Sequence, residues 1–420
     1  MRRHIDEREY KADRVPFELF QNADDATLEL GPNEAGAHRV RVELDDGRLR
    51  LVHWGRSLND VGPDREKGRR HRHDQDLQKL LMPGFSSKWF DERTTGRFGL
   101  GFKSVYLVTD YPLIVSRWLA VRIKGTLFPE AAPEAVELAR SFGAERPATV
   151  IELPRHQNGP VPSDYAKSFR DSLGPLCVFA KAIRTISWNA GDEELESTWR
   201  PSSVSDIAGL EVGRLEPGTE GGAAQRVLVF RRDTEALLLC LGGMGVVRTA
   251  DPVPTVWSLA PTSERWRSGY LLNGAFQVDV GRSRLAGDQE GNACRLRAFG
   301  TRLGEQLVTL FEAADRHWPG LARRLGLDDH SKRGFVSFWR SLIEVLSRGL
   351  AEGAPGAALL RELHTQGRGL SALVTRCRAL PTTLQGDGGD LVAFDASTRA
   401  ARGAIADDTL RRDAAAWPWA

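Results

Sequence analysis

The sequence predicts a mixed α/β protein with a largely helical C-terminal region. An amphipathic helical pattern covers residues 16–30, and the proline at its start suits a first helical turn. Two segments that alternate apolar and polar residues, 38–44 and 48–54, are joined by an Asp-Asp-Gly turn, which is typical of a β-hairpin. Helical patterns dominate the last third of the chain, for example over 296–313.

Length and composition limit the class of protein. A chain of 420 residues is too long for one ordinary core, so we expect two or three domains. The 58 Lys and Arg residues nearly balance the 56 Asp and Glu residues, so no overall charge demands nucleic acid or a membrane. The four cysteines are far apart, which fits thiols in a reducing compartment better than disulfides or zinc. With no signal peptide and no apolar run long enough for a membrane span, we expect a soluble cytoplasmic protein.

Changes in composition along the chain suggest its organisation. We expect a charged N-terminal arm at 1–15, a first domain at 16–155, a middle α/β domain at 163–290 and a mostly helical region at 291–420. Inside the first domain, residues 60–95 have little periodicity and are rich in charged residues, Gly and Pro, as functional lids often are. Further strands are expected at 113–118, 119–123 and 149–153.

One face of the first helix carries polar groups in line. At roughly 100° per residue, Glu18, Asn22, Asp25 and Glu29 fall within an arc of about 60°. The opposite side is apolar and can pack. An amphipathic surface helix is the simpler interpretation of this stretch taken alone.

A glycine-rich stretch, residues 96–104, has the sequence Gly-Arg-Phe-Gly-Leu-Gly-Phe-Lys-Ser. It is one residue too long for a P-loop, because Phe102 separates Gly101 from Lys103, and it does not match G-x-G-x-x-G either. Three glycines in six residues still allow backbone N–H groups to converge on an anion. An expected helix at 103–108 would favour phosphate at its start. A flexible turn is the alternative.

Together, residues 18–26 (Glu-Leu-Phe-Gln-Asn-Ala-Asp-Asp-Ala) and residues 96–104 resemble the N-box and the second glycine box of the GHKL ATPases. The resemblance is closest to the branch of sacsin and the ninety-kilodalton heat-shock chaperones. Weaker matches support it: 84–88 looks like a lid motif, and 148–154 resembles the strand whose threonine lies near the adenine. Residues 271–285 are similar to a middle-domain segment of sacsin-like proteins.

The resemblance implies a Bergerat fold, a two-layer α+β sandwich in which a mixed sheet lies against helices and ATP lies under a lid. The implied function is Mg²⁺-dependent ATP binding and slow hydrolysis, an ATPase activity that drives lid closure in a chaperone-like machine. Two alternatives stay open: an ATP-gated subunit of a nucleic-acid-acting defence or repair complex, and a nucleotide binder without turnover. A protein client, a partner subunit or a homodimer is compatible with each, and nucleic acid is not excluded.

The resemblance also assigns roles to residues. Glu18 would be the general base that deprotonates the attacking water. Asn22 would hold Mg²⁺ through its side-chain oxygen, and Asp25 would support the nucleotide site. The other residues implied to bind the nucleotide and its phosphates are Gly55, Lys88, Gly99, Gly101, Phe102, Lys103 and Thr149.

One position departs from the family pattern. His53 stands where the family has the aspartate that accepts a hydrogen bond from the adenine amino group. A neutral imidazole has one acceptor nitrogen and can take that bond, whereas a protonated ring cannot. The sequence therefore leaves open whether the nucleotide is ATP or another nucleoside triphosphate. A core histidine at a strand end is the alternative.

A basic residue from the middle domain completes the site in the chaperone and topoisomerase branches by reaching the γ-phosphate. Arg282 or Arg284 is the candidate, because a guanidinium group matches phosphate oxygens bidentately. A surface arginine pair beside a strand is the alternative.

Overall fold

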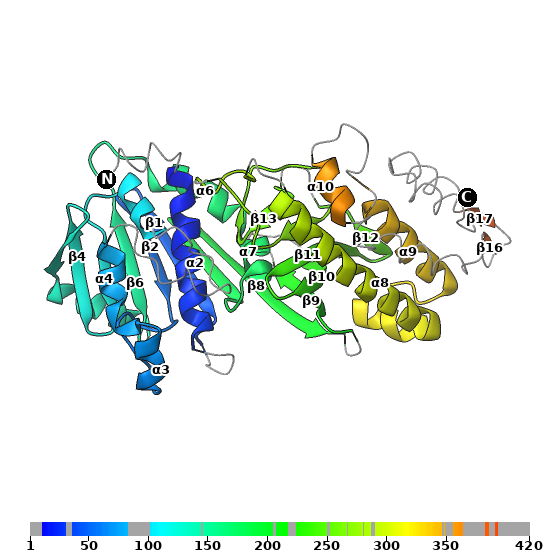
Figure 1. Ribbon diagram of the computed structural model, residues 1–420, viewed down its shortest axis with the longest axis horizontal. Helices are drawn as coiled ribbons and strands as arrows, with labels where there is room; N and C mark the ends of the chain where they lie inside the picture. Colours follow the sequence, from blue (N-terminus) through cyan, green and yellow to red (C-terminus); the bar gives the residue numbers. More distant parts are fainter. Residues whose placement is uncertain are drawn as a thin grey trace. The chain divides into compact units, whose positions relative to one another are not determined.

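The structure is a computed structural model of the 420-residue chain. It describes residues 11–30, 36–82, 101–143, 146–204, 207–216, 224–249, 253–266, 268–279, 281–286, 290–346, 348, 356–363, 383–385 and 391–393. The chain divides into two compact units (Figure 1). Unit 1 comprises Met1–Trp199 and Leu215–Ala224, and unit 2 comprises Arg200–Arg214 and Gln225–Ala420.

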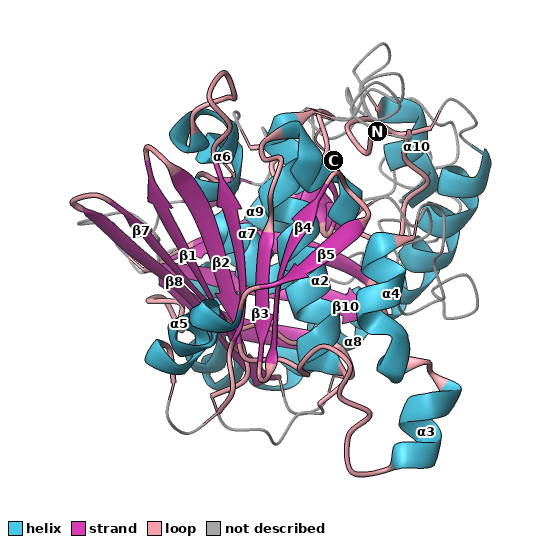
Figure 2. Cartoon of the chain, turned by 90° about the vertical axis from the view of Figure 1, so that its left-hand side faces the viewer, coloured by secondary structure: helices cyan, strands magenta, loops and turns pink. Residues whose placement is uncertain are grey.

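Unit 1 contains a mixed sheet. Its strands are β1 (Arg39–Asp45), β2 (Arg48–His53), β3 (Leu113–Ser116), β4 (Leu119–Lys124), β5 (Phe128–Ala131), β6 (Thr149–Pro154), β7 (Thr185–Ala190) and the first part of β8 (Glu193–Ser203). They lie in the order β8-β7-β1-β2-β6-β3-β4-β5. Figure 2 shows strands of this sheet, with β1, β2 and β3 in the foreground. β1 and β7 run parallel, and the other neighbouring pairs run antiparallel. A parallel pair needs a crossover connection, which the helices between β6 and β7 provide.

The helical elements of unit 1 are short apart from one. They are η1 (Ala12–Arg14), α2 (Val15–Leu28), α3 (Arg65–Arg70), η2 (His73–Gln75), α4 (Asp76–Leu81), η4 (Phe102–Leu107), η5 (Pro133–Ala135), α5 (Val136–Ser141), α6 (Pro162–Arg170) and α7 (Leu173–Phe179). α2 has a proline in its first turn, where the missing N–H has no helical partner to lose. Its Phe17 and Phe20 rings pack edge-on against Phe169 of α6.

The two faces of this sheet carry different kinds of side chain. Val52, Val115 and Val150 are neighbours across β2, β3 and β6, and they pack with Ala135 and Ala139 in a cluster under α5. Since side chains alternate along a strand, the residues next to these valines point to the opposite face. α2 contacts β2, and the polar groups described below lie on that opposite face.

Unit 2 combines a second set of strands with long helices. The strands are β9 (Leu210–Glu216), β10 (Gln225–Arg232), β11 (Glu235–Gly242), β12 (Gly245–Val247), β13 (Val256–Ser258), β14 (Ala260–Pro261) and β15 (Leu271–Asn273). Their order is β14-β13-β15-β11-β10-β9, with β12 paired to β11. The helices are α8 (Glu290–Leu325), α9 (Lys332–Leu346) and α10 (Ala357–Arg361), and β16 (Thr383–Gln385) pairs with β17 (Leu391–Ala393).

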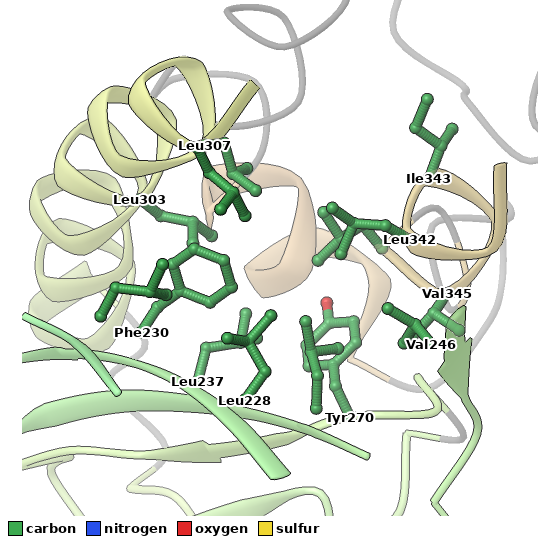
Figure 3. Packing of buried hydrophobic residues seen from close by; sticks show 14 of the residues in the cluster. Leu228, Phe230, Leu237, Val246, Tyr270, Leu303, Leu307, Leu342, Ile343 and Val345 are labelled. Carbon is green, nitrogen blue, oxygen red and sulfur yellow. The ribbon is translucent and has the colours of Figure 1, made fainter. Parts of the chain in front are cut away.

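The core of unit 2 is apolar. Leu303 and Leu307 of α8 and Leu342 of α9 point toward Phe230 and Leu237 of the sheet (Figure 3). These side chains are at most 1% exposed. α8 has non-helical backbone angles at His317, close to a proline that lies inside the helix.

The fold-class prediction, a mixed α/β chain with a helical C-terminal region, is confirmed by these elements. The helix expected at 103–108 is present as the 3₁₀ helix η4, from Phe102 to Leu107. The sequence also gave no sign of β7, which pairs in parallel with β1 inside unit 1. The compact units therefore divide later than the expected boundary near residue 160. Whether the predicted domains fold independently stays a prediction.

No helix in the described part of the chain is both long enough and apolar enough to cross a membrane.

Candidate functional site

The start of α2 meets the end of the glycine-rich stretch. A side chain on Gly101 would place its Cβ 2.6 Å from a carboxylate oxygen of Glu18, closer than real Cβ contacts. The backbone of Gly101 therefore lies directly beside this carboxylate, and a larger residue here would displace the Glu18 side chain. Glu18 is 5% exposed, and Asn22 follows one helical turn later in a half-buried position. The structure thus brings together two predicted site residues that are distant in the sequence.

The end of α2 meets a second glycine in the same way. A Cβ on Gly55 would lie 2.8 Å from the backbone of Ala26 and Thr27, so the chain after β2 can approach the helix only with glycine here. The backbone N–H of Arg56 donates to the Ala26 carbonyl at 2.8 Å. The Arg56 guanidinium also pairs with Glu29 and, at 2.7 Å, with Asp76 of α4. This loop is therefore fixed to both helices.

The two adjacent aspartates of α2 have structural partners. Asp24 is fully buried and accepts hydrogen bonds from the backbone N–H groups of Lys181, Ala182 and Ile183 at 2.9–3.0 Å. Burial raises the pKa of the Asp24 carboxyl, and the three N–H groups oppose that rise. Asp25 forms an ion pair with the Lys181 ammonium group at 2.9 Å. Both carboxylates thus attach α2 to the segment that leads into β7.

A row of polar side chains crosses three neighbouring strands on the face that α2 contacts. His53 of β2 is the register partner of Thr149 in β6, and Thr149 is the partner of Ser116 in β3. All three are buried, at 5%, 2% and 1% exposure. The hydroxyl oxygens of Ser116 and Thr149 lie 2.7 Å apart, and Ser116 accepts the N–H of Leu58 at 2.9 Å. Polar residues at strand ends beside a helix are suited to recognise a ligand.

His53 is neutral near pH 7. Its Nδ1 accepts the backbone N–H of Gly55 at 3.2 Å. Burial and, to a smaller extent, the positive charge of Arg56 lower the pKa of the His53 imidazole to about 4.

Lys103 has a different environment from the one the resemblance implies. Lys103 is 1% exposed. Its ammonium group donates to the carbonyl oxygens of Leu81, at 2.7 Å, and Thr126, at 3.3 Å. Burial lowers the pKa of this lysine to about 8. Carbonyl oxygens carry only partial negative charge, so the ammonium group can still attract an anion. A phosphate contact for Lys103 stays a prediction.

A cavity of about 290 Å³ lies beside the loop after β2. Its lining residues are Leu30, Gly55, Arg56, Ser57, Asp60, Arg117, Arg146 and Pro147. Each arginine of the lining has a partner within the protein: Arg56 pairs with Asp76, Arg117 pairs with Asp60, and Arg146 donates to the Trp54 carbonyl. The three arginines that line the cavity are therefore held in place by hydrogen bonds and ion pairs.

The remaining predicted site residues divide into three groups. Phe102 is buried at the start of η4, immediately after Gly101. Lys88 and Gly99 lie outside the described residues. Arg282 and Arg284 belong to unit 2, in a turn closed by hydrogen bonds from their backbone N–H groups to Asp279. Arg282 has a left-handed φ of 54°, and Arg284 is exposed.

Sequence reasoning missed three residues of this region. Asp24 and Lys181 were missed because a hydrogen bond between positions 24 and 181 leaves no mark in local spacing. Ser116 had a detectable signal, since it is the polar end of the otherwise apolar strand Leu-Ile-Val-Ser. Among the described residues, no cluster of three or more His, Cys, Asp or Glu side chains could hold a metal ion. A metal here would depend on ligands such as the Asn22 amide and a bound phosphate.

Comparisons with known proteins do not identify a family for this chain. No protein-family model matches the chain, and no curated protein matches it. Among solved structures, it is similar to the topoisomerase IV ATP-binding domain of Francisella tularensis in complex with a small-molecule inhibitor, with 17% identity and a TM-score of 0.30. The match covers 54% of this chain and 57% of that chain, so it spans little more than half of that structure. A likeness of this size does not determine the family or the function.

Proposed function

We propose that unit 1 binds a nucleoside triphosphate with Mg²⁺ and hydrolyses it slowly, as the resemblance to GHKL ATPases implies for ATP. One observation carries the proposal: the carboxylate of Glu18 lies against the backbone of Gly101. These residues belong to the two sequence stretches on which the resemblance depends. A general base beside a backbone that can bind phosphate is the arrangement that hydrolysis of a phosphoanhydride requires.

The roles of the residues follow from their positions on α2. Glu18 is buried, and its carboxylate lies beside Gly101, where it would accept a proton from the attacking water. Asn22, one turn later and half-buried, would hold Mg²⁺ through its amide oxygen together with phosphate oxygens. The metal would neutralise negative charge on the phosphates. Gly101 and Phe102 would offer backbone N–H groups to the same phosphates.

The proposal includes a conformational cycle of the chaperone-like type, in which residues 60–95 close over the nucleotide. The described part of this segment, 60–82, is attached to α2 through Arg56, which pairs with both Glu29 and Asp76. A nucleotide can shift this segment toward the closed state only as far as it binds the closed state more tightly than the open state. Hydrogen exchange of peptides from 60–95, with and without a non-hydrolysable ATP analogue, measures the closure. Equal protection in both samples contradicts the cycle.

Calorimetric titration with ATP, GTP and ADP in Mg²⁺, followed by a phosphate-release assay, tests binding and turnover. Glu18→Ala should leave triphosphate affinity nearly unchanged and lower turnover at least about a hundredfold, because a base acts in the transition state. Asn22→Ala should weaken the Mg²⁺-dependent part of binding. Asp13→Ala is the matched control, since it removes an exposed carboxylate just before α2 and should change neither quantity.

Three outcomes separate the alternatives. Turnover of Glu18→Ala at the wild-type rate contradicts the role of Glu18. Nucleotide binding with no phosphate release by the wild-type protein favours a binder without turnover. Release that begins only when nucleic acid is added favours the ATP-gated subunit of a nucleic-acid-acting complex.

A further inference from the structure

The imidazole of His53 has a defined tautomer. A backbone N–H can only donate, and the N–H of Gly55 donates to Nδ1 of His53 at 3.2 Å. Nδ1 therefore carries no proton, and in the neutral ring the proton is on Nε2. The single acceptor nitrogen of the ring is already used within the protein. The edge of the ring that faces away from Gly55 is thus a hydrogen-bond donor.

The neighbours of His53 stabilise this arrangement. Gly55 cannot move away from the helix without breaking the close approach to Ala26 and the hydrogen bond from Arg56. Arg56 also disfavours a second proton on the ring, since its charge lies close to it. The donor at Nε2 is therefore fixed by the loop geometry.

Beside His53 lie hydroxyl groups that can take either role. Thr149 is the register partner of His53, and its hydroxyl shares one hydrogen with Ser116 at 2.7 Å. Ser116 already accepts the N–H of Leu58, so one hydroxyl of the pair can rotate to serve a ligand as donor or acceptor. In this row, His53 alone has a fixed hydrogen-bonding character.

We infer that the nucleotide site selects a 6-oxopurine base, guanine or hypoxanthine, because His53 offers an N–H donor to the base. This inference rests on the proposed nucleotide-binding function. A 6-oxo group accepts a hydrogen bond, and the adjacent N1–H can donate to the hydroxyl pair of Thr149 and Ser116. A 6-amino group would face the Nε2–H donor with a donor of its own. Both would then lose their bonds to water without replacement.

Affinities of the wild-type protein for four Mg²⁺ nucleotides test the inference without any substitution: ITP, GTP, ATP and purine riboside triphosphate, which has no 6-substituent. ITP should bind at least about tenfold more tightly than ATP and purine riboside triphosphate, because only the 6-oxo group pairs with the donor. GTP should also bind more tightly than ATP, because guanine has the same 6-oxo group as hypoxanthine. If ATP or purine riboside triphosphate binds as tightly as ITP, the base is not read through a 6-oxo group and the inference is overturned.

The same titration separates this inference from the proposed function. Tight ATP binding without a preference for ITP overturns the inference and leaves nucleotide binding intact. Absence of binding by all four nucleotides overturns both. His53→Asp replaces the donor with an acceptor and should reverse the preference toward ATP, and an unchanged ratio in a folded His53→Asp protein overturns the inference.

Nitrogen NMR of the ligand-free protein tests the premise even where His53→Asp fails to fold. The ¹⁵N shifts and couplings of a histidine ring distinguish which nitrogen carries the proton. His53→Gln serves to assign the signal, because it removes that one ring. We expect a proton on Nε2 and none on Nδ1 at pH 7, and a proton on Nδ1 would overturn the inference.

Discussion

The two units of the chain bury different kinds of side chain. The buried Asp, Glu, His, Lys and Arg residues in the described part of unit 1 are Arg14, Glu18, Asp24, Asp25, His53, Asp76 and Lys103. In the described part of unit 2, the buried polar residues are all uncharged: Thr255, Thr262, Ser268, Asn273, Asn292 and Gln306. Unit 2 is thus stabilised by aliphatic and aromatic packing, whereas unit 1 also contains charges in its interior.

This difference indicates where function lies. Burying a charged group costs free energy unless the group is paired, so a stable core has no need of one. Some buried charges in unit 1 are paired for structural reasons, as Asp25 is with Lys181 and Asp76 with Arg56. Glu18 and His53 both lie beside glycine-containing loops. Buried ionisable groups in such positions are candidates for a functional site.

The largest effect on stability is expected from Asp24, whose charge is structural. Asp24→Ala would leave the buried N–H groups of Ala182 and Ile183 and the partly buried N–H group of Lys181 without an acceptor. At about 1–3 kcal/mol for each unsatisfied group, we expect a loss of roughly 3–9 kcal/mol in the free energy of unfolding. Denaturant unfolding followed by circular dichroism measures it.

Asp24→Asn is the graded variant for this prediction. Oδ1 of Asp24 accepts from Ala182 and Ile183, and Oδ2 accepts from Lys181. An asparagine whose oxygen takes the Oδ1 position keeps two of these bonds, so it should cost less than alanine does. Equal losses for the two variants would show that the hydrogen bonds are not the cause.

In unit 2, a comparable loss of folding stability is expected when a buried apolar side chain is shortened. Leu342 is fully buried between α9 and the sheet (Figure 3). Leu342→Ala should destabilise the protein by about 2–5 kcal/mol, through lost burial and the cavity that remains. Nucleotide affinity, measured by titration under conditions where the variant stays folded, should not change. A loss of affinity in the folded variant would contradict the assignment of unit 2 as a structural core.

The two arginines of unit 2 that the sequence proposes for the nucleotide site are not part of its buried core. Arg282 and Arg284 lie in a turn held by Asp279, and neither is buried. The double variant Arg282→Ala and Arg284→Ala should lower turnover about tenfold, because a guanidinium group that reaches the γ-phosphate acts on its negative charge. ADP affinity should hardly change, since ADP has no γ-phosphate. Equal turnover in the variant and the wild type would remove these arginines from the site.

The sequence predicted the local elements of unit 1 well, because they depend on local patterns. The hairpin over 38–54 became β1 and β2, and the helix over 16–30 became α2, each within two residues of its expected ends. The sequence identified Gly55 and Gly101 as candidate nucleotide-binding residues, and the structure shows that both lie against α2. Elements that depend on short spacing could therefore be predicted from the sequence.

Long-range pairing could not be predicted in the same way. The parallel pairing of β1 with β7 joins segments that are far apart in the sequence, and nothing in either segment specifies the other. The ring nitrogen that His53 uses was also undetermined, because it depends on where the Gly55 N–H points. Residue type identified His53 as a candidate, but its hydrogen-bonding character required the backbone of the loop.

The smallest effect, and the most specific one, is expected from the pH dependence of stability at His53. The pKa of this ring is about 4 in the folded protein and about 6.5 in an unfolded chain. Between these values the unfolded chain binds a proton that the folded protein does not, so stability falls as the pH falls through this window. From pH 7 to pH 5.5, the contribution of His53 to the free energy of unfolding should fall by about 1 kcal/mol.

Other groups titrate in the same range, so the measurement is the difference between wild type and His53→Gln in denaturant unfolding at several pH values. Glutamine does not titrate, and the difference therefore isolates the ring. The wild type should lose stability relative to His53→Gln as the pH falls from 7 to 5.5. Parallel curves for the two proteins would mean that the ring is not buried in its neutral form, and unit 1 would then lose one of the two groups that distinguish it from a purely structural core.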